Sequence, residues 1–129
     1  MTTYKFGDVV LVPFPFTNQS TTKKRPAIII SSEDYNRCKP DLILIAVTSN
    51  AKTDLQFGEV FIDEWSAAGL IKPSIIKPII TTAENSLVIK MLGTLRPLDL
   101  QALENILCQI IIGRAKILGL EDERNKEQK

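Results

Sequence analysis

A basic junction stands immediately before one of the most apolar stretches of the chain. Lys23, Lys24 and Arg25 lead through Pro26 into the isoleucine triplet at 28–30. Arg25 is the strongest candidate for chemistry, because a planar guanidinium held where a loop meets a strand can bind a phosphate through two parallel hydrogen bonds. A solvated charge run that keeps a strand end soluble is the alternative, and spacing alone favours it.

Small polar side chains close a second apolar stretch. Thr48, Ser49 and Asn50 follow the apolar residues 42–47, and a hydroxyl at a strand end can donate a hydrogen bond to a phosphate oxygen or to a leaving oxygen. The same residue types are favoured in turns, so these three residues taken alone indicate only that a turn begins here.

Two phenylalanines, Phe14 and Phe16, alternate with two prolines just before the polar segment Thr17 to Lys24. An aromatic ring beside a basic loop can stack on a base of a single-stranded nucleic acid. We expect Phe14 in the core, and Phe16, which borders the loop, as the exposed ring. Trp65 lies in a short turn and is expected to cover the core.

The residue types that the chain lacks exclude several classes of function. The sequence has no histidine, which removes the usual general base near neutral pH, the commonest metal ligand and every Ser-His or Cys-His triad. Cys38 and Cys108 belong to no C-x-x-C pair, so no metal site is expected and a reducing compartment is favoured over a disulfide. The sequence shows no glycine-rich nucleotide-binding motif, secretory signal or membrane-length apolar run, so we expect a cytoplasmic protein.

Size and charge bound the organisation of the chain. It has 129 residues, a length typical of one soluble domain. Its formal net charge of +1 is too small to attract the whole protein to nucleic acid or to a membrane surface. Any nucleic-acid site must therefore be a local patch. We expect one domain over residues 1–120 and a flexible, charged tail over residues 121–129.

The pattern predicts several sequential strands followed by one helix. Strands are expected over residues 7–16, 25–31, 41–49, 57–62 and 87–95, with a polar connection over 33–40, a single helical turn over 63–69, and a bulge or bend at Gly93. The helix begins at Pro97 and carries an apolar stripe toward an expected stop at Gly119. Arg114 and Ile112 do not fit this stripe, which indicates either a bend near Gly113 or a second interface at Ile112. This order favours a small antiparallel barrel or half-barrel capped by the helix.

Five segments in this order resemble the MazF/PemK family, the toxins of type II toxin–antitoxin modules. They are G-D-V-V-L-V-P-F-P-F-T, K-R-P-A-I-I-I-S, D-L-I-L-I-A-V-T-S, A-G-L-I-K-P-S-I-I-K-P and L-G-T-L-R-P-L-D-L-Q-A-L, and the match spans about residues 5–112. The resemblance implies a mainly β fold with a C-terminal helix, an SH3-like antiparallel barrel of the kind also found in the toxins Kid and CcdB, and a homodimer. It also implies a sequence-specific endoribonuclease that cuts single-stranded RNA without a cofactor. The implied protein partner is an antitoxin whose C-terminal segment occupies the RNA groove.

The resemblance also assigns residues. The family's functional arginine falls on Arg25 and its functional threonine on Thr48, while RNA contacts fall on Phe16, Thr17 and Gln19. Lys24 is a candidate second cation, and Ser49 and Asn50 belong to the region expected to contact RNA.

The implied products are a 2′,3′-cyclic phosphate and a 5′-hydroxyl end. Guanidinium groups stay protonated in proteins, so Arg25 is expected to stabilise the charge of the phosphorane rather than to abstract a proton. Thr48 is expected to orient the phosphate or to pass a proton to the leaving oxygen.

One departure from the family keeps two alternatives open. Some members carry a glutamate and a histidine in the loop before the R-P motif, and residues 17–23 contain neither. The alternatives are a toxin of the same fold that binds a protein target such as DNA gyrase, and a catalytically silent member.

Overall fold

The computed structural model describes residues 3–14, 23–49 and 54–114. Over these residues the strands are β1 (Asp8–Phe14), β2 (Lys23–Ile29), β3 (Asp41–Ser49), β4 (Val60–Ile62), β5 (Ser74–Glu84) and β6 (Lys90–Thr94). The α-helices are α1 (Glu33–Cys38) and α2 (Pro97–Leu107); a 3₁₀ turn, η1 (Asn85–Leu87), precedes β6, and a π-helical turn, η2 (Cys108–Ile112), continues α2. The expected tail over residues 121–129 lies outside the described residues. None of the described helices is long and apolar enough to cross a membrane.

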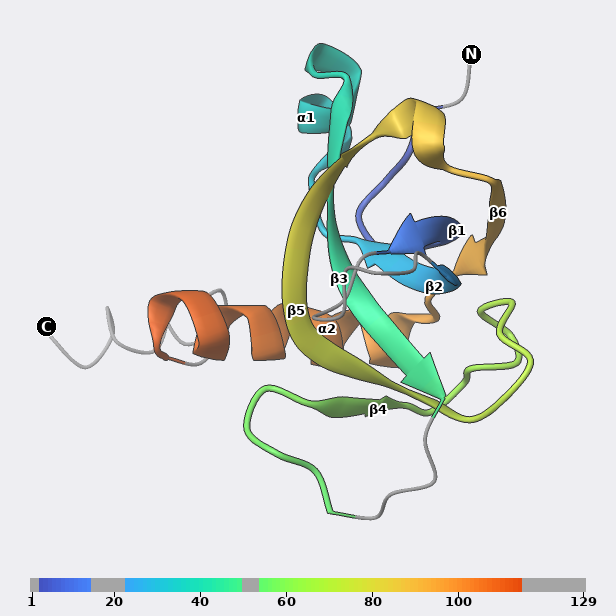
Figure 1. The fold of residues 1–129 in the computed structure, drawn as a ribbon. Coiled ribbons are helices and arrows are strands. Elements are labelled where there is room, and N and C mark those ends of the chain that lie inside the picture. Colours follow the sequence, from blue (N-terminus) through green and yellow to red (C-terminus); the bar gives the residue numbers. More distant parts are fainter. Residues whose placement is uncertain (1–2, 15–22, 50–53, 115–129) are drawn as a thin grey trace, which may run out of the picture.

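The strands form one antiparallel sheet in the order β4-β5-β3-β2-β1-β6. The sheet curls strongly, and α2 runs across it (Figure 1). The expected class, a mainly β half-barrel with a C-terminal helix, is confirmed. Because β2 and β3 are antiparallel neighbours, the end of β3 and the start of β2 lie at the same end of the sheet.

Two register irregularities accompany this curvature. Between β1 and β6, Val9 pairs with Gly93 and Val10 with Met91, which leaves Leu92 as the extra residue of a bulge. This confirms the irregularity expected at Gly93. Between β3 and β5, the register shifts after Ile45, and bulges of this kind bend a strand and increase its twist.

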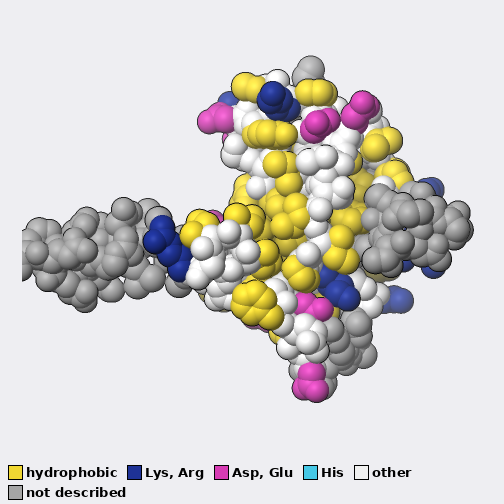
Figure 2. Space-filling view, turned by 60° about the vertical axis from the view of Figure 1, so that its left-hand side comes forward, with side chains coloured by type: hydrophobic (Ala, Val, Ile, Leu, Met, Phe, Trp, Pro, Cys, Tyr) yellow, Lys and Arg dark blue, Asp and Glu magenta, His cyan; other side chains and the backbone are white. Residues whose placement is uncertain are grey.

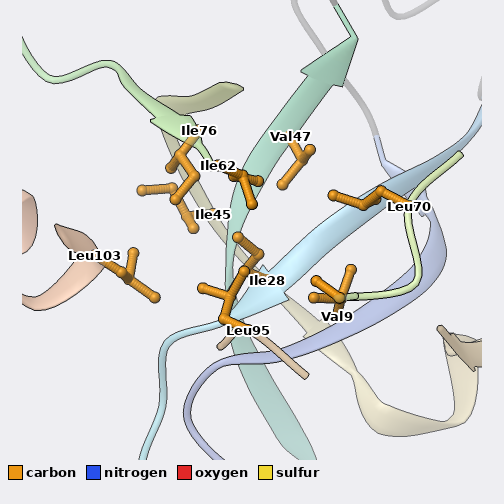
Figure 3. Close-up of a cluster of buried hydrophobic side chains, with 10 residues drawn as sticks. Val9, Ile28, Ile45, Val47, Ile62, Leu70, Ile76, Leu95 and Leu103 are labelled. Carbon is orange, nitrogen blue, oxygen red and sulfur yellow. The ribbon is translucent and has the colours of Figure 1, made fainter. Parts of the chain in front are cut away.

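Side-chain alternation along the strands produces two apolar clusters. The first contains Val9, Ile28, Ile45 and other buried side chains, and α2 adds Leu103 to it (Figure 3). The second contains the neighbours of these residues on the opposite face, among them Phe14. The expected core position of Phe14 is confirmed by its exposure of 1%. These clusters fix the strands from which the site is built.

Two segments differ from the sequence-based expectation. The sequence predicts only a polar connection over residues 33–40, but Glu33–Cys38 is a helix, α1. Its N-cap Ser32 accepts a hydrogen bond from the Tyr35 N–H at 3.1 Å. Strand β5 continues through Pro78, where no strand was assigned. Strand β5 tolerates Pro78 because this residue lies inside the β3–β5 bulge and has no pairing partner on β3, so no backbone N–H is needed there for a hydrogen bond between the strands.

The C-terminal helix begins at Pro97 as expected. It then widens into the π turn η2 and ends at Gly113, whose φ of 88° is left-handed. The described helical run thus ends at Gly113, near which the sequence allows a bend, and the expected stop at Gly119 lies outside the described residues. Because glycine has no Cβ, it adopts this left-handed conformation at a lower conformational cost than other residues, which makes Gly113 a favourable end for the helix.

Candidate functional site

The register of β2 and β3 brings the two strongest sequence candidates together. The antiparallel ladder between these strands runs from the pair Ala27–Ala46 to the pair Ile29–Leu44. Arg25 and Thr48 each lie two residues beyond the first of these pairs, and Lys24 and Ser49 each lie one residue further, all at the same end of the sheet. This end of the strand pair therefore carries two cations and two hydroxyls.

A pocket of about 460 Å³ lies at this end of the sheet. Lys24, Arg25, Thr48 and Ser49 all line it. Its apolar lining comes from side chains such as Leu11, Pro26, Val47, Leu70 and Leu92. The pocket therefore combines an apolar lining with a few polar groups, an arrangement typical of sites that bind and orient a ligand.

The exposure of the four polar residues suits different roles. Arg25 and Thr48 are half-buried, whereas Lys24 and Ser49 are exposed. A half-buried guanidinium is held in fewer conformations and in a less polar environment, so it orients and binds an anion more strongly than an exposed ammonium does. Arg25 and Thr48 are therefore the positioned pair of the pocket, with Lys24 and Ser49 at its rim.

The pocket also contains residues that the sequence analysis did not select. Lys72 and Lys90 add two cations, and Ser74 adds a third hydroxyl. Among the described residues that line the pocket, none is acidic. Lys72 lies within the A-G-L-I-K-P-S segment and could have been suspected from it, but no sequence signal points to Lys90, which enters because β6 pairs with β1.

Four sequence candidates cannot be placed. Phe16, Thr17, Gln19 and Asn50 lie outside the described residues, so their assignment to RNA contacts stays a prediction. Among the residues that are described, no group of three or more histidine, cysteine, aspartate or glutamate side chains is arranged as metal ligands. Cys38 and Cys108 are both free thiols.

A tightly packed segment forms the far wall of the pocket. At Gly69, φ is +93°, and a Cβ there would overlap the carbonyl oxygen of Leu92. A Cβ at Gly93 would likewise overlap the Ala68 carbonyl. The turn 63–69 therefore lies directly against β6. Its start is fixed by the buried carboxylate of Asp99, which accepts hydrogen bonds from the N–H groups of Asp63 and Glu64, each at 2.9 Å.

Comparisons with known proteins identify the family of the chain. Residues 5–111 match the family of PemK-like, MazF-like toxins of type II toxin–antitoxin systems. No curated protein matches the chain.

Several solved structures share the fold at low sequence identity. An endoribonuclease in complex with its cognate antitoxin from a mycobacterial species superposes with a TM-score of 0.68 and 15% identity, covering 90% of this chain and 100% of that one. A MazE–MazF structure from Deinococcus radiodurans gives 0.67 and 18%, covering 88% and 100%. A MazF structure from the same organism gives 0.67 and 19%, covering 86% and 98%.

Proposed function

Because the chain belongs to the PemK-like, MazF-like toxins of type II toxin–antitoxin systems, we propose that it is a metal-independent, sequence-specific endoribonuclease that cleaves single-stranded RNA. The observation that carries this proposal is the pocket that contains both Arg25 and Thr48. The solved structures of the same fold include proteins described as endoribonucleases, which supports the same reaction class.

The proposed reaction is an internal transesterification. The ribose 2′-oxygen loses its proton and bonds to the adjacent phosphorus, and the bond from phosphorus to the 5′-oxygen breaks. The products are a 2′,3′-cyclic phosphate and a 5′-hydroxyl, so no water is consumed and no metal is needed to supply a nucleophile.

Each residue of the pocket has a role that its chemistry fits. Arg25 binds the non-bridging oxygens and stabilises the extra negative charge of the phosphorane, because its donors form a fixed fork. The hydroxyl of Thr48, on the neighbouring strand, donates to a phosphate oxygen or to the leaving 5′-oxygen. Lys24 adds a second positive charge at the rim, and Ser49 contacts the bound strand.

We also propose the partners and the assembly. The endoribonuclease from a mycobacterial species was solved with its cognate antitoxin, and by analogy a cognate antitoxin inhibits this chain by placing its C-terminal segment in the RNA groove. The protein acts in the cytoplasm as a homodimer. Phe16, Thr17, Gln19 and Asn50 contribute further contacts to the RNA.

Incubation of the purified protein with a long single-stranded RNA in EDTA tests this function. We expect discrete cuts with cyclic-phosphate ends from the wild type, and a rate about a hundredfold to a thousandfold lower for Arg25→Ala and for Thr48→Ala, the usual effect of losing one oxyanion donor. Circular dichroism and thermal melting of both variants provide the control for folding.

Two results would contradict the proposal. Undiminished cleavage by Arg25→Ala would remove the assigned role of this residue. A folded wild type that cuts none of several RNAs would indicate a toxin that binds a protein target or a catalytically silent member, and a supercoiling assay with DNA gyrase would distinguish these two.

A further inference from the structure

The pocket is larger than the reacting phosphate requires. Its volume of about 460 Å³ lies within the range of roughly 300–1,000 Å³ that holds whole small-molecule ligands. Arg25 comes from the start of β2 and Thr48 from the end of β3, whereas Lys90 comes from β6 and Lys72 from the segment between the turn 63–69 and β5. The cations thus stand on several separate elements.

The segment that carries Lys72 has a defined position. Gly69 fixes one end of this segment against Leu92, and at the other end the hydroxyl of Ser74 donates a hydrogen bond to the carbonyl oxygen of Lys72 at 2.8 Å. Leu70, between these points, is buried in the first core cluster. The side chains of residues 71 and 72 are therefore presented by a fixed backbone rather than by a freely moving loop.

This fixed segment presents an exposed aliphatic side chain beside a cation. Ile71 lines the pocket and is 87% exposed, while its neighbour Leu70 is 7% exposed. An isoleucine held in water at the rim of a cationic pocket offers an apolar surface of the kind that an unstacked base can cover. Lys72 and Lys90 offer charges that pair with phosphates, and no acidic side chain among the described lining residues competes for them.

We propose that Ile71, Lys72 and Lys90 form a second contact area for the RNA strand, which we call the distal wall. Lys72 and Lys90 bind phosphates that flank the phosphate held by Arg25, and Ile71 packs against a base of a flanking nucleotide. This inference rests on the proposed function and deepens it, because it assigns residues of this chain to the nucleotides that flank the reacting phosphate.

Two measurements on Lys72→Gln and Lys90→Gln test the charges of the distal wall. The first is the salt dependence of binding to a short 2′-deoxy oligonucleotide, which the proposed reaction cannot cut because it lacks the 2′-hydroxyl. Each substitution should reduce the slope of log affinity against log salt by about 0.7, the value for one phosphate contact on a single strand. The second is cleavage kinetics, in which KM should rise about three- to fivefold with kcat unchanged, as expected for one solvent-screened ion pair.

Lys39→Gln is the matched control. Lys39 is exposed and caps α1, which lies at the other end of β3 from the pocket (Figure 1). The length of β3, nine residues, separates it from the site by about 30 Å. Ile71→Ser should weaken binding of the oligonucleotide without changing the salt slope, and Leu98→Ser, an exposed leucine on α2 outside the pocket, is its control.

The outcomes separate this inference from the proposed function. If the wild type cuts RNA and both lysine variants match Lys39→Gln in slope and KM, the distal wall is refuted and the nuclease stands. If the wild type cuts no RNA but the slopes fall as expected, the cationic wall stands and the nuclease is refuted. Equal affinities for Ile71→Ser and Leu98→Ser would remove the base contact alone.

Discussion

At the residue scale, the proposed role of Arg25 depends on the shape of its side chain as much as on its charge. Arg25 and Lys24 are neighbours and both line the pocket, yet Arg25 is half-buried and Lys24 is exposed. A guanidinium presents parallel donors that match two phosphate oxygens, whereas an ammonium is a point charge that reorients freely. The two cations should therefore not be interchangeable.

We expect Arg25→Lys to separate these contributions. The variant keeps the positive charge, so the salt slope for binding the 2′-deoxy oligonucleotide should stay at the wild-type value. It loses the second parallel hydrogen bond to the phosphorane, so the cleavage rate should fall about tenfold or more while remaining above that of Arg25→Ala. Single-turnover cleavage measures the rate. A variant as fast as the wild type would show that charge alone suffices.

A second residue-scale prediction concerns the buried carboxylate of Asp99. It is 2% exposed and accepts two backbone N–H groups at 2.9 Å. Asp99→Ala leaves both donors without this acceptor, so the free energy of unfolding should fall by about 3 kcal/mol. Urea denaturation measures it, and Asp63→Asn, whose side chain is exposed in the same turn, should stay within about 0.5 kcal/mol of the wild type. Equal stabilities of the two variants would contradict the capping role of Asp99.

At the scale of elements, the contact between Gly69 and Gly93 holds the turn 63–69 against β6. Ile71 and Lys72 follow this turn directly, so the contact positions the segment that carries them beside β6. It works because two backbones without side chains can approach closely. The bulge at Leu92 in β6 belongs to the same contact, since the Leu92 carbonyl is the atom that Gly69 accommodates.

Comparison of two glycines tests this contact. Gly69 and Gly113 have similar φ values, +93° and +88°, but a Cβ at Gly113 would have nothing within 4 Å. The backbone cost of alanine is thus similar at both positions, and the overlap with Leu92 arises at Gly69. Gly69→Ala should lower the free energy of unfolding by about 2 kcal/mol more than Gly113→Ala. Equal losses in thermal or urea melts would show that the contact can relax freely.

Individual elements differ in how far the sequence predicts them. The bounds of β3, Asp41–Ser49, follow from a long apolar run bounded by polar residues, and the structure confirms them. The sequence does not predict β5, because Pro78 argues against a strand until the bulge opposite it is known. Helix α1 was missed because its six residues are mostly polar and carry no apolar stripe. Its cap at Ser32 was the available signal.

At the scale of the whole molecule, the site combines four separate parts of the chain. Arg25 and Thr48 could be selected from local pattern and family resemblance, since each lies at the end of an apolar run. Lys72 and Lys90 join them through the sheet order β4-β5-β3-β2-β1-β6 and through the packing of the turn 63–69. The A-G-L-I-K-P-S segment points to Lys72, but no local pattern encodes its placement in the pocket or points to Lys90, so this half of the pocket required the fold.

The last prediction concerns assembly. One face of the molecule carries hydrophobic side chains over much of its middle (Figure 2), and the π turn η2 exposes Ile111 by 65% and Ile112 by 54%. Ile112 does not belong to the apolar stripe of α2 that faces the core. Packing against the core therefore does not explain why an apolar residue stands at this position. Covering such side chains with a second copy would remove apolar surface from water, the driving force of most homodimers.

Sedimentation of the wild type should therefore give about 29 kDa, twice the 14.4 kDa chain mass. Ile112→Asp places a charge in the proposed interface, whose desolvation on association is unfavourable, and should shift the protein toward the monomer mass. Leu98→Asp, on the first turn of α2 and 66% exposed, should remain dimeric. A dimer in both variants would place the interface elsewhere, and a monomeric wild type would contradict the homodimer itself. If the Ile112→Asp monomer still cleaves RNA, one copy of the pocket suffices for catalysis. If the folded monomer no longer cleaves RNA, the RNA site spans both subunits.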